Sequence, residues 1–345
     1  MNIRDSGGHI PWLDGWRGIA IALVLAEHFF GIATGHLGVQ VFFVLSGLLI
    51  SQILFEQRIP LRTFYRRRAA RILPAFYLYV LVVTLAGLFI LPSVDWSSVG
   101  TTALFLRSYF GGHIWDDPLP FGNLWSLNVE EHAYVFLSVL AFIAATRSER
   151  TARWLLSLAT LVPLAGVVYF HAFPEPPGIT PFHLRTEGAI FPLLASAAIF
   201  LWSRARRIVI SEFIASSILA ATILVAAVDT VGVAHGGTMI KMLLLPLLLA
   251  LSVNVLHRMP AIVRQLLSAR WITWLGTCSF SLYLWHYPFY VLINQGVWPF
   301  GSMAALLCAT LIGAASFYWV EKPLRALLRG AQPKVSNAVA PAPAA

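Results

Sequence analysis

Two ionisable side chains that could do chemistry lie in one apolar stretch near the start of the chain, LDGWRGIAIALVLAEHFF. Arg17 and His28 are 11 residues apart, so on an α-helix they point within about 20° of each other, roughly 16 Å apart along the axis. A guanidinium binds anions, and a neutral imidazole, with an ordinary pKa of about 6.5, accepts protons at neutral pH. The pair is suited to hold an anionic reactant and to act as a general base.

Both residues also have ordinary explanations. A membrane arginine near a helix end can extend its guanidinium to lipid headgroups, and a histidine can hydrogen-bond a neighbouring helix. Glu27 lies directly before His28, and ionisable side chains inside a bilayer are costly and usually functional. We therefore interpret His28 as functional and leave both interpretations open for Arg17.

A second basic element follows in FYRRRAARILP. Arg68 and Arg71 are three residues apart, on one side of a predicted helix that contains Pro74. Guanidinium groups suit phosphates, so this element can bind a phosphate-rich donor, although attraction to anionic lipids is an alternative. Ser46, in VFFVLSGLLIS, can pack against another helix or contact a ligand.

Two more polar groups interrupt apolar stretches. Glu130 and Glu131, in LWSLNVEEHAYVF, are expected near the outer end of a helix. They could bind a cation, anchor sugar hydroxyls or pair with a base, but glutamate is also common in the first turn of a helix. His286, in SFSLYLWHYPFY, can be a ligand contact or a hydrogen-bonded helix contact, and Pro288 is expected to kink its helix.

The elements that position these residues are membrane helices. The chain is 58% hydrophobic and only 11% charged, and it repeats apolar runs of about 20 residues, which excludes an ordinary soluble domain. We predict an all-α, polytopic membrane helix bundle of about ten transmembrane helices. The predicted segments are 15–34, 37–55, 72–92, 124–146, 154–171, 188–203, 208–229, 238–257, 271–294 and 301–320.

The distribution of charge gives an orientation. The net charge is +9, yet most Lys and Arg residues fall in alternate connections and at the ends, which is typical of a membrane protein and not of a nucleic-acid-binding protein. Both termini are therefore predicted to be cytoplasmic. The first apolar run continues into Glu27 and His28 without a small-residue cleavage site, so we expect it to be retained. Residues 1–322 form the predicted membrane domain, and 323–345 a short, disordered cytoplasmic tail.

Five blocks carry a resemblance. LDGWRGIAIALVLAEH, GVQVFFVLSGLLIS, RRRAARILPAFYL, LWSLNVEEHAYVF and SFSLYLWHYP occur in the order found in the acyltransferase 3 family of integral membrane acyltransferases. The chain resembles this family from Leu13 to about Lys322. The resemblance implies a ten-helix bundle in the bacterial cytoplasmic (inner) membrane. It also implies transfer of an acyl group, commonly acetyl, from cytoplasmic acetyl-CoA or another acyl-CoA to a hydroxyl of a carbohydrate or glycolipid acceptor.

The resemblance also implies roles for single residues. His28 and Arg17 match the family's histidine and arginine of the first helix, Arg68 and Arg71 its Arg-x-x-Arg element, and Glu130 its glutamate. We predict His28 as the general base, or as an acyl carrier, with Arg17 holding the donor or stabilising charge on the thioester oxygen. Glu130 would orient the acceptor or the imidazole.

The remaining predictions concern ligands. Arg68, Arg71 and Arg17 are predicted to bind the acyl-CoA donor, and Glu131, His286 and Ser46 the acceptor. Membrane lipids are expected partners, and neither a metal nor nucleic acid is predicted. A transporter or flippase of a lipid or polysaccharide precursor, without acyl transfer, is the main alternative, because it would also place ionisable residues in the bilayer.

The sequence departs from the family pattern at three positions. Trp16 replaces a leucine, His132 replaces a glutamine, and Glu27 precedes the motif histidine, where it could alter the basicity of His28. Because little follows the tenth segment, the esterase-like extension of the family is expected to be absent.

Overall fold

A computed structural model describes residues 10–110, 114–173, 180–231 and 240–329. All regular structure in this part of the chain is helical, as predicted. The longer α-helices are α1 (Pro11–Phe30), α2 (Gly35–Ser51), α3 (Leu61–Ile90), α5 (Trp125–Thr146), α6 (Glu149–Ala172), α8 (Phe191–Ala205), α9 (Glu212–Thr230), α11 (Leu245–Asn254), α13 (Arg270–Asn294) and α14 (Gly301–Ser316). The shorter elements are η2 (Gln52–Glu56), α4 (Trp96–Ala103), η3 (Gly122–Leu124), η4 (Phe182–Leu184), α7 (Thr186–Ala189), η5 (Ile240–Leu244), η6 (Leu256–Arg258), α12 (Ala261–Leu267), η7 (Phe317–Glu321) and α15 (Lys322–Arg329).

The helices confirm a polytopic membrane bundle. Among the described residues, six stretches have the length and apolar composition to cross a membrane: Gly35–Glu56, Leu61–Ile90, Gly122–Thr146, Glu149–Phe170, Glu212–Thr230 and Gly301–Leu328. Phe191–Ala205 and Ile240–Asn254 are shorter apolar helices. The remaining two, α1 and α13, are 20 and 25 residues long and carry the polar residues singled out from the sequence. Each of the ten predicted segments thus corresponds to a helix.

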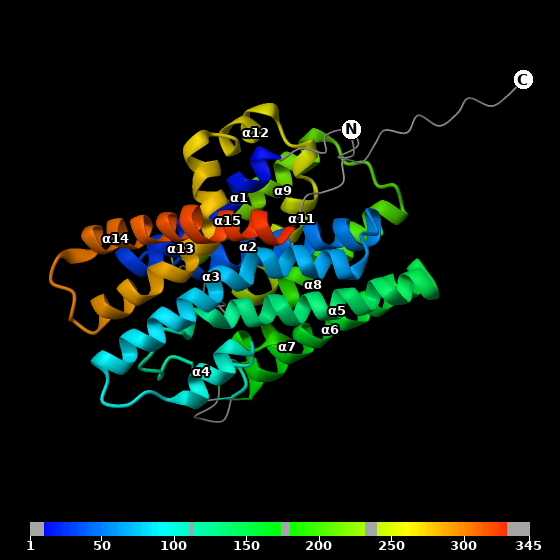
Figure 1. Cartoon of the computed structure of the whole chain (residues 1–345). Helices are drawn as coiled ribbons and strands as arrows, with labels where there is room; N and C mark the ends of the chain where they lie inside the picture. Colours follow the sequence, from blue (N-terminus) through cyan, green and yellow to red (C-terminus); the bar gives the residue numbers. More distant parts are fainter. Residues whose placement is uncertain (1–9, 111–113, 174–179, 232–239, 330–345) are drawn as a thin grey trace, which may run out of the picture.

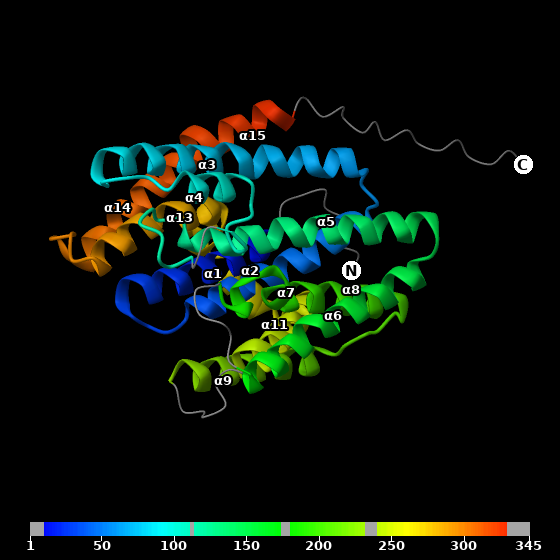
Figure 2. The same ribbon diagram turned by 90° about the horizontal axis from the view of Figure 1, so that it is seen from below.

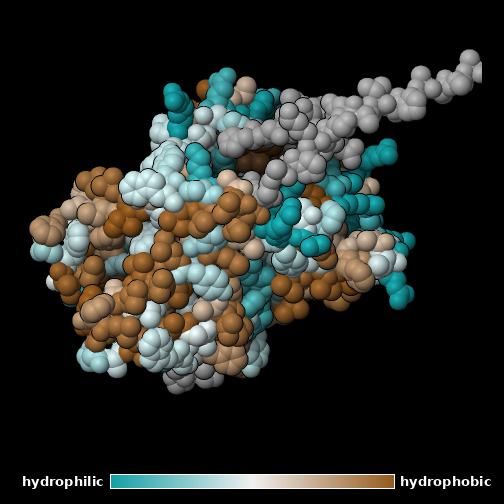
Figure 3. Space-filling view, viewed as in Figure 1, coloured by the Kyte–Doolittle hydropathy of each residue, from teal (hydrophilic) through white to brown (hydrophobic). Residues whose placement is uncertain are grey.

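The helices form a layered bundle. Seen from below, α3, α14 and α15 lie on one side and α6, α9 and α11 on the other, with α1 and α2 between them (Figures 1 and 2). Hydrophobic side chains dominate the left and lower part of the face shown in Figure 3, and hydrophilic side chains gather along its upper edge and at its right margin. In Figure 1 this margin is where the α2–α3 and α5–α6 connections lie. A broad apolar surface beside polar connections is the pattern expected for contact with lipid.

The α1 and α13 helices run parallel and unusually close together. A Cβ atom added at Gly276 would lie 1.8 Å from the carbonyl oxygen of Asp14, and one at Gly18 would lie 2.1 Å from that of Ile272. Only glycine permits this approach of two backbones, as in other membrane helix pairs packed through small residues. The close packing fixes the register that brings His28 of α1 level with His286 of α13.

Two helices extend beyond their predicted limits. The α3 helix begins at Leu61 rather than at 72, so its arginines already belong to a continuous helix of 30 residues. At the other end of the chain, α15 continues the last membrane helix to Arg329 and packs against α3. The predicted domain boundary after residue 322 therefore falls inside a helix, and residues 330–345 lie outside the described part of the chain.

Candidate active site

The α1 helix carries Arg17 and His28 into two different cavities. The arginine cavity, of about 70 Å³, is lined by Arg17, Arg68, Arg71, Ser126, Glu130 and Tyr283 together with apolar residues. The histidine cavity, of about 640 Å³, is lined by His28, Glu27, His36, Gln40, Asn123, Lys241, Tyr287 and other residues. A third cavity, of about 490 Å³, reaches His28 between Trp115, Tyr287 and Tyr290. The shared face of α1 predicted from the spacing thus opens into separate compartments.

Arg68 is held rigidly at the wall of the arginine cavity. One of its terminal nitrogens (NH2) lies 3.3 Å from Oε2 of Glu130, and its Nε donates to Oε1 of Glu131 at 3.0 Å. Its guanidinium stacks over the ring of Tyr134, with 3.4 Å from the guanidinium carbon to the ring centroid. Glu130 also accepts hydrogen bonds from Ser46 (2.8 Å) and Tyr134 (3.0 Å). This network joins α2, α3 and α5 and satisfies both carboxylates.

Arg17 and Arg71 differ from Arg68 in their partners. Within the described part of the chain, no carboxylate lies within 4 Å of either guanidinium, and Nε of Arg17 is buried without a hydrogen-bond partner. The cavity lining therefore holds three guanidinium groups against a single carboxylate, that of Glu130. Because a desolvated guanidinium needs an acceptor, the arrangement fits an anionic ligand such as a phosphate.

His28 and His286 form a directly bonded pair. Nδ1 of His28 lies 2.8 Å from Nε2 of His286, and Nδ1 of His286 lies 3.1 Å from the carbonyl oxygen of Leu282. A carbonyl only accepts, so Nδ1 of His286 carries a proton and its Nε2, in the neutral ring, is an acceptor. Nδ1 of His28 must then donate, which leaves Nε2 of His28 with a free lone pair. No hydrogen bond from a described residue occupies that atom.

Aromatic rings and a carboxylate fix the surroundings of His28. The ring of Tyr290 stacks on His28 with centroids 4.1 Å apart, and Tyr287 meets it edge-on at 5.9 Å. Glu27 accepts a hydrogen bond from the backbone N–H of Gly35 at 2.5 Å. The Glu27 carboxylate therefore holds the first residue of α2 and lines the histidine cavity as well.

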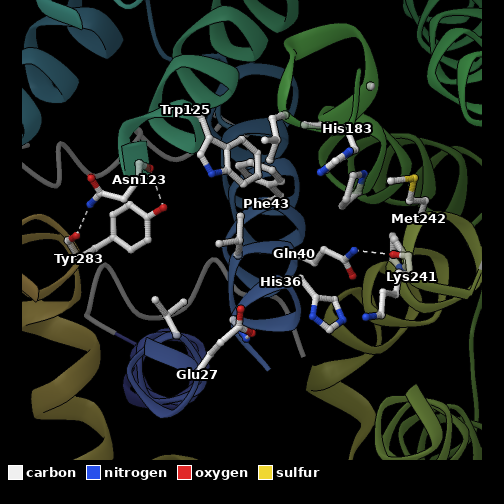
Figure 4. A pocket seen from close by; sticks show the side chains of 18 of the residues that line it. Glu27, His36, Gln40, Phe43, Asn123, Trp125, His183, Lys241, Met242 and Tyr283 are labelled. Carbon is white, nitrogen blue, oxygen red and sulfur yellow. Dashed lines mark hydrogen bonds between the residues drawn. The ribbon is translucent and has the colours of Figure 1, made fainter. Parts of the chain in front are cut away.

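A thin partition separates the two main cavities. Val39 and Phe43 of α2 and Tyr283 of α13 line both of them. Tyr283 donates its hydroxyl to the carbonyl of Asn123 at 2.8 Å, and its own carbonyl accepts from the Asn123 amide at 2.7 Å (Figure 4). Among the described residues, these three side chains are therefore common to the walls of both cavities.

The structure groups the predicted residues differently from the sequence. It brings Arg17, Arg68, Arg71 and Glu130 to one cavity, with Ser46 and Glu131 bonded to them through Glu130 and Arg68. His286 is fully buried behind His28. We expected Glu130 to lie with His28, but the long α3 helix carries Arg68 to it.

Several contacts of the cavity residues were not predicted from the sequence. Tyr134 lies one helical turn after Glu130, a spacing that could have indicated their contact. His36 and Asp229 are 193 residues apart, and the Gln40 amide bonds the carbonyl of Lys241 across 201 residues. No local pattern indicates such long-range pairs.

Comparisons with known proteins agree with this description. The family described as Acyltransferase domain, acyltransferase 3, matches residues 10–319. The chain is 30% identical to YrhL of Bacillus subtilis (strain 168), provisionally named a peptidoglycan O-acetyltransferase, over 92% of this chain and 55% of that protein. It is 27% identical to the peptidoglycan O-acetyltransferase OatA of Listeria monocytogenes (strain EGD-e), over 93% and 57%. It is 26% identical to the O-acetyltransferase OatA of Staphylococcus aureus (strain NCTC 8325), over 92% and 57%.

The matches cover nearly all of this chain but only part of each relative. The chain spans little more than half the length of these relatives, 55% to 57%. No solved structure matches it. The family match covers both cavities and all five sequence blocks. On this basis the chain belongs to the acyltransferase 3 family, and its described helices form a multi-pass membrane bundle.

Proposed function

We propose that the protein transfers an acyl group, most simply acetyl, from acyl-CoA to a hydroxyl of a carbohydrate or glycoconjugate at the bacterial cytoplasmic membrane. One observation carries this proposal. The α1 helix presents Arg17 to a cavity rich in guanidinium groups, and it presents His28, with a free ring nitrogen, to a much larger cavity that shares the lining residues Val39, Phe43 and Tyr283 with the first. This arrangement supports a phosphate-bearing donor on one side and a hydroxyl acceptor on the other.

The residues of the arginine cavity fit the donor. Coenzyme A carries several phosphates, and Arg17 and Arg71 offer guanidinium groups without carboxylate partners among the described residues. Arg68 contributes a third guanidinium, held in place by Glu130 and Glu131. We assign Arg17 to donor binding rather than to the thioester oxygen, because it lines a different cavity from His28. Glu130 then positions Arg68 and shapes the donor site.

The residues of the histidine cavity fit the chemistry. Nε2 of His28 takes the proton of the acceptor hydroxyl while that oxygen attacks the thioester carbonyl carbon. The carbon–sulfur bond breaks, the coenzyme A thiolate leaves, and the proton passes from His28 to the thiolate or to solvent. His286 holds His28 in the tautomer that leaves Nε2 free, as the third member of a catalytic triad does for its histidine. An acyl-His28 intermediate is the two-step version of this route.

The names of the relatives support the class of acceptor. Two of them are named for peptidoglycan, so a carbohydrate of the cell envelope is the acceptor we infer. The histidine cavity, at about 640 Å³, lies in the range of small-molecule binding sites. It is lined by Trp115, Trp125 and Tyr287, and flat aromatic faces suit the apolar faces of sugar rings.

Labelled donor tests this function directly. Membranes containing the wild type or the His28→Ala variant receive acetyl-CoA labelled in the acetyl group, and label is followed into lipid and polysaccharide fractions. We expect transfer by the wild type and a loss of about 10²–10⁴-fold in the variant, the usual contribution of a general base.

The main alternative gives a different result. A transporter or flippase would move its substrate without consuming the thioester. Folded wild-type protein that leaves acetyl-CoA intact across a broad set of acceptors and acyl donors would favour that alternative. Equal transfer by the wild type and His28→Ala would remove His28 from the mechanism.

A further inference from the structure

One wall of the histidine cavity carries basic side chains. His36 of α2, His183 of η4 and Lys241 of η5 line the cavity on the side opposite Asn123 and Tyr283 (Figure 4). Lys241 is the only charged residue of Ile240–Asn254, in an otherwise apolar helix. A lysine there is costly in a membrane unless it has a partner or a function.

Lys241 is fixed in place by its backbone. Its carbonyl accepts the side-chain amide of Gln40 at 2.5 Å, which ties η5 to α2. The side chain is half-buried and lines the cavity. Within the described part of the chain, no carboxylate lies within 4 Å of its ammonium. The ammonium therefore offers donors to whatever occupies the cavity.

His36 is oriented by a carboxylate that does not itself line the cavity. Nε2 of His36 lies 2.7 Å from Oδ2 of Asp229, and the Asp229 side chain is only 2% exposed against 28% for His36. The imidazole, and not the carboxylate, thus faces the cavity. Glu27 is the one carboxylate of the described cavity lining, and it is already bonded to the Gly35 N–H. Lys241 is therefore the one side chain of the described cavity lining that carries a permanent positive charge.

We propose that Lys241, oriented beside His36, forms a subsite for a negatively charged group of the acceptor, a carboxylate or a phosphate carried by the sugar. This inference rests on the proposed acyl transfer and defines its acceptor as an anionic carbohydrate. The acceptor lies across the cavity, with its hydroxyl at Nε2 of His28 and its anionic group at Nζ of Lys241. Ammonium groups bind such oxygens through charge-assisted hydrogen bonds.

Direct binding tests the subsite without requiring turnover. The purified full-length protein is titrated by calorimetry with two probes: a neutral tetramer of N-acetylglucosamine and a tetrasaccharide that alternates N-acetylglucosamine with glucuronate. A third probe, N-acetylglucosamine phosphate linked to a short prenyl chain, distinguishes a lipid-linked phosphate from a sugar carboxylate. We expect at least one anionic probe to bind about 10–100-fold more tightly than the neutral one, the value of one charge-assisted hydrogen bond.

Variants of Lys241 make the test specific. Lys241→Gln should remove the preference for the anionic probe and leave binding of the neutral probe within about twofold, whereas Lys241→Arg should keep most of the preference. Lys322→Gln, which removes an exposed lysine outside the cavity, should leave the preference intact. Wild-type protein that binds neutral and anionic probes equally would overturn the subsite, as would an equal loss for both probes in Lys241→Gln.

Turnover measurements distinguish a failure of the anion subsite from a failure of acyl transfer. With each probe as acceptor, consumption of acetyl-CoA is measured for the wild type and Lys241→Gln. A wild type that acetylates neutral and anionic sugars equally contradicts the subsite and leaves acyl transfer standing. A wild type that binds the anionic probe through Lys241 but never consumes the thioester contradicts acyl transfer and leaves the anion subsite standing.

Discussion

Nδ1 of His28 lies 2.8 Å from Nε2 of His286, although 258 residues separate the two in the sequence. The bond exists because α1 and α13 run parallel and close together, and it continues to the carbonyl of Leu282. This chain of hydrogen bonds determines which nitrogen of His28 is free to accept a proton. The geometry makes His286 a positioning residue for His28, which leads to the first prediction.

Replacing His286 should lower the rate and leave donor affinity unchanged. His286→Ala removes the acceptor for Nδ1 of His28, so we expect kcat to fall about 10–100-fold, the value of a hydrogen bond of 1–3 kcal/mol. KM for acyl-CoA should stay constant. His286→Gln, whose amide oxygen can accept the same proton, should restore part of the rate. An increase in KM for the acceptor at constant kcat would instead support the acceptor-binding role predicted from the sequence.

The close contact of α1 and α13 should be sensitive to one added methyl group. At Gly276 a Cβ atom would lie 1.8 Å from the Asp14 carbonyl oxygen, so Gly276→Ala must move the two backbones apart. We expect a loss of about 1–3 kcal/mol in stability and a lower kcat, both measured on detergent-purified protein. Gly100→Ala is the matched control, because nothing lies within 4 Å of its added Cβ. Equal melting temperatures for the two variants would contradict the close approach.

The sequence predicts the helices of this fold better than it predicts the site. A helix that spans a bilayer needs an apolar run of about 20 residues, so all ten helical segments can be predicted from the sequence. The shared face of Arg17 and His28 is likewise readable from helical periodicity. The sequence could not show that the face opens into two cavities, because Val39, Phe43 and Tyr283 come from other helices.

The placement of Glu130 shows the same limit. From the sequence, we predict that Glu130 orients the acceptor or the imidazole. Its partners are instead Ser46 and Arg68, 84 and 62 residues away, and only the packing of α2, α3 and α5 brings them together. Tyr134, one turn further along α5, is the one partner that a local spacing could have indicated.

Arg71 should affect donor binding through its charge. It lines the arginine cavity without a carboxylate partner among the described residues, so Arg71→Gln should raise KM for acyl-CoA about 10–100-fold, the range for a hydrogen bond to a charged group. Arg66→Gln removes an exposed arginine of the same helix and should change KM by less than about twofold. If both variants raise KM equally, general attraction by basic residues explains the effect and the cavity does not.

Glu130 should contribute to stability through Arg68. Glu130→Ala removes the acceptor of three hydrogen bonds, from Ser46, Arg68 and Tyr134, and we expect a loss of about 1–3 kcal/mol. The control is Glu149→Ala, which breaks an exposed pair with Arg58 and should cost less than about 1 kcal/mol. Thermal unfolding in detergent measures both. Full stability with abolished transfer in Glu130→Ala would support the catalytic role predicted from the sequence.

The partition between the cavities should control passage of the acyl group. Val39 lines both the arginine and the histidine cavity, so a larger side chain there should obstruct the route from the bound phosphates to His28. We expect Val39→Phe to lower transfer about tenfold or more, through a steric cost of 1–3 kcal/mol. Val139→Phe, at a position of α5 that is 52% exposed, is the matched control and should transfer normally. Wild-type transfer by Val39→Phe would show that the acyl group reaches His28 by a route that avoids this partition.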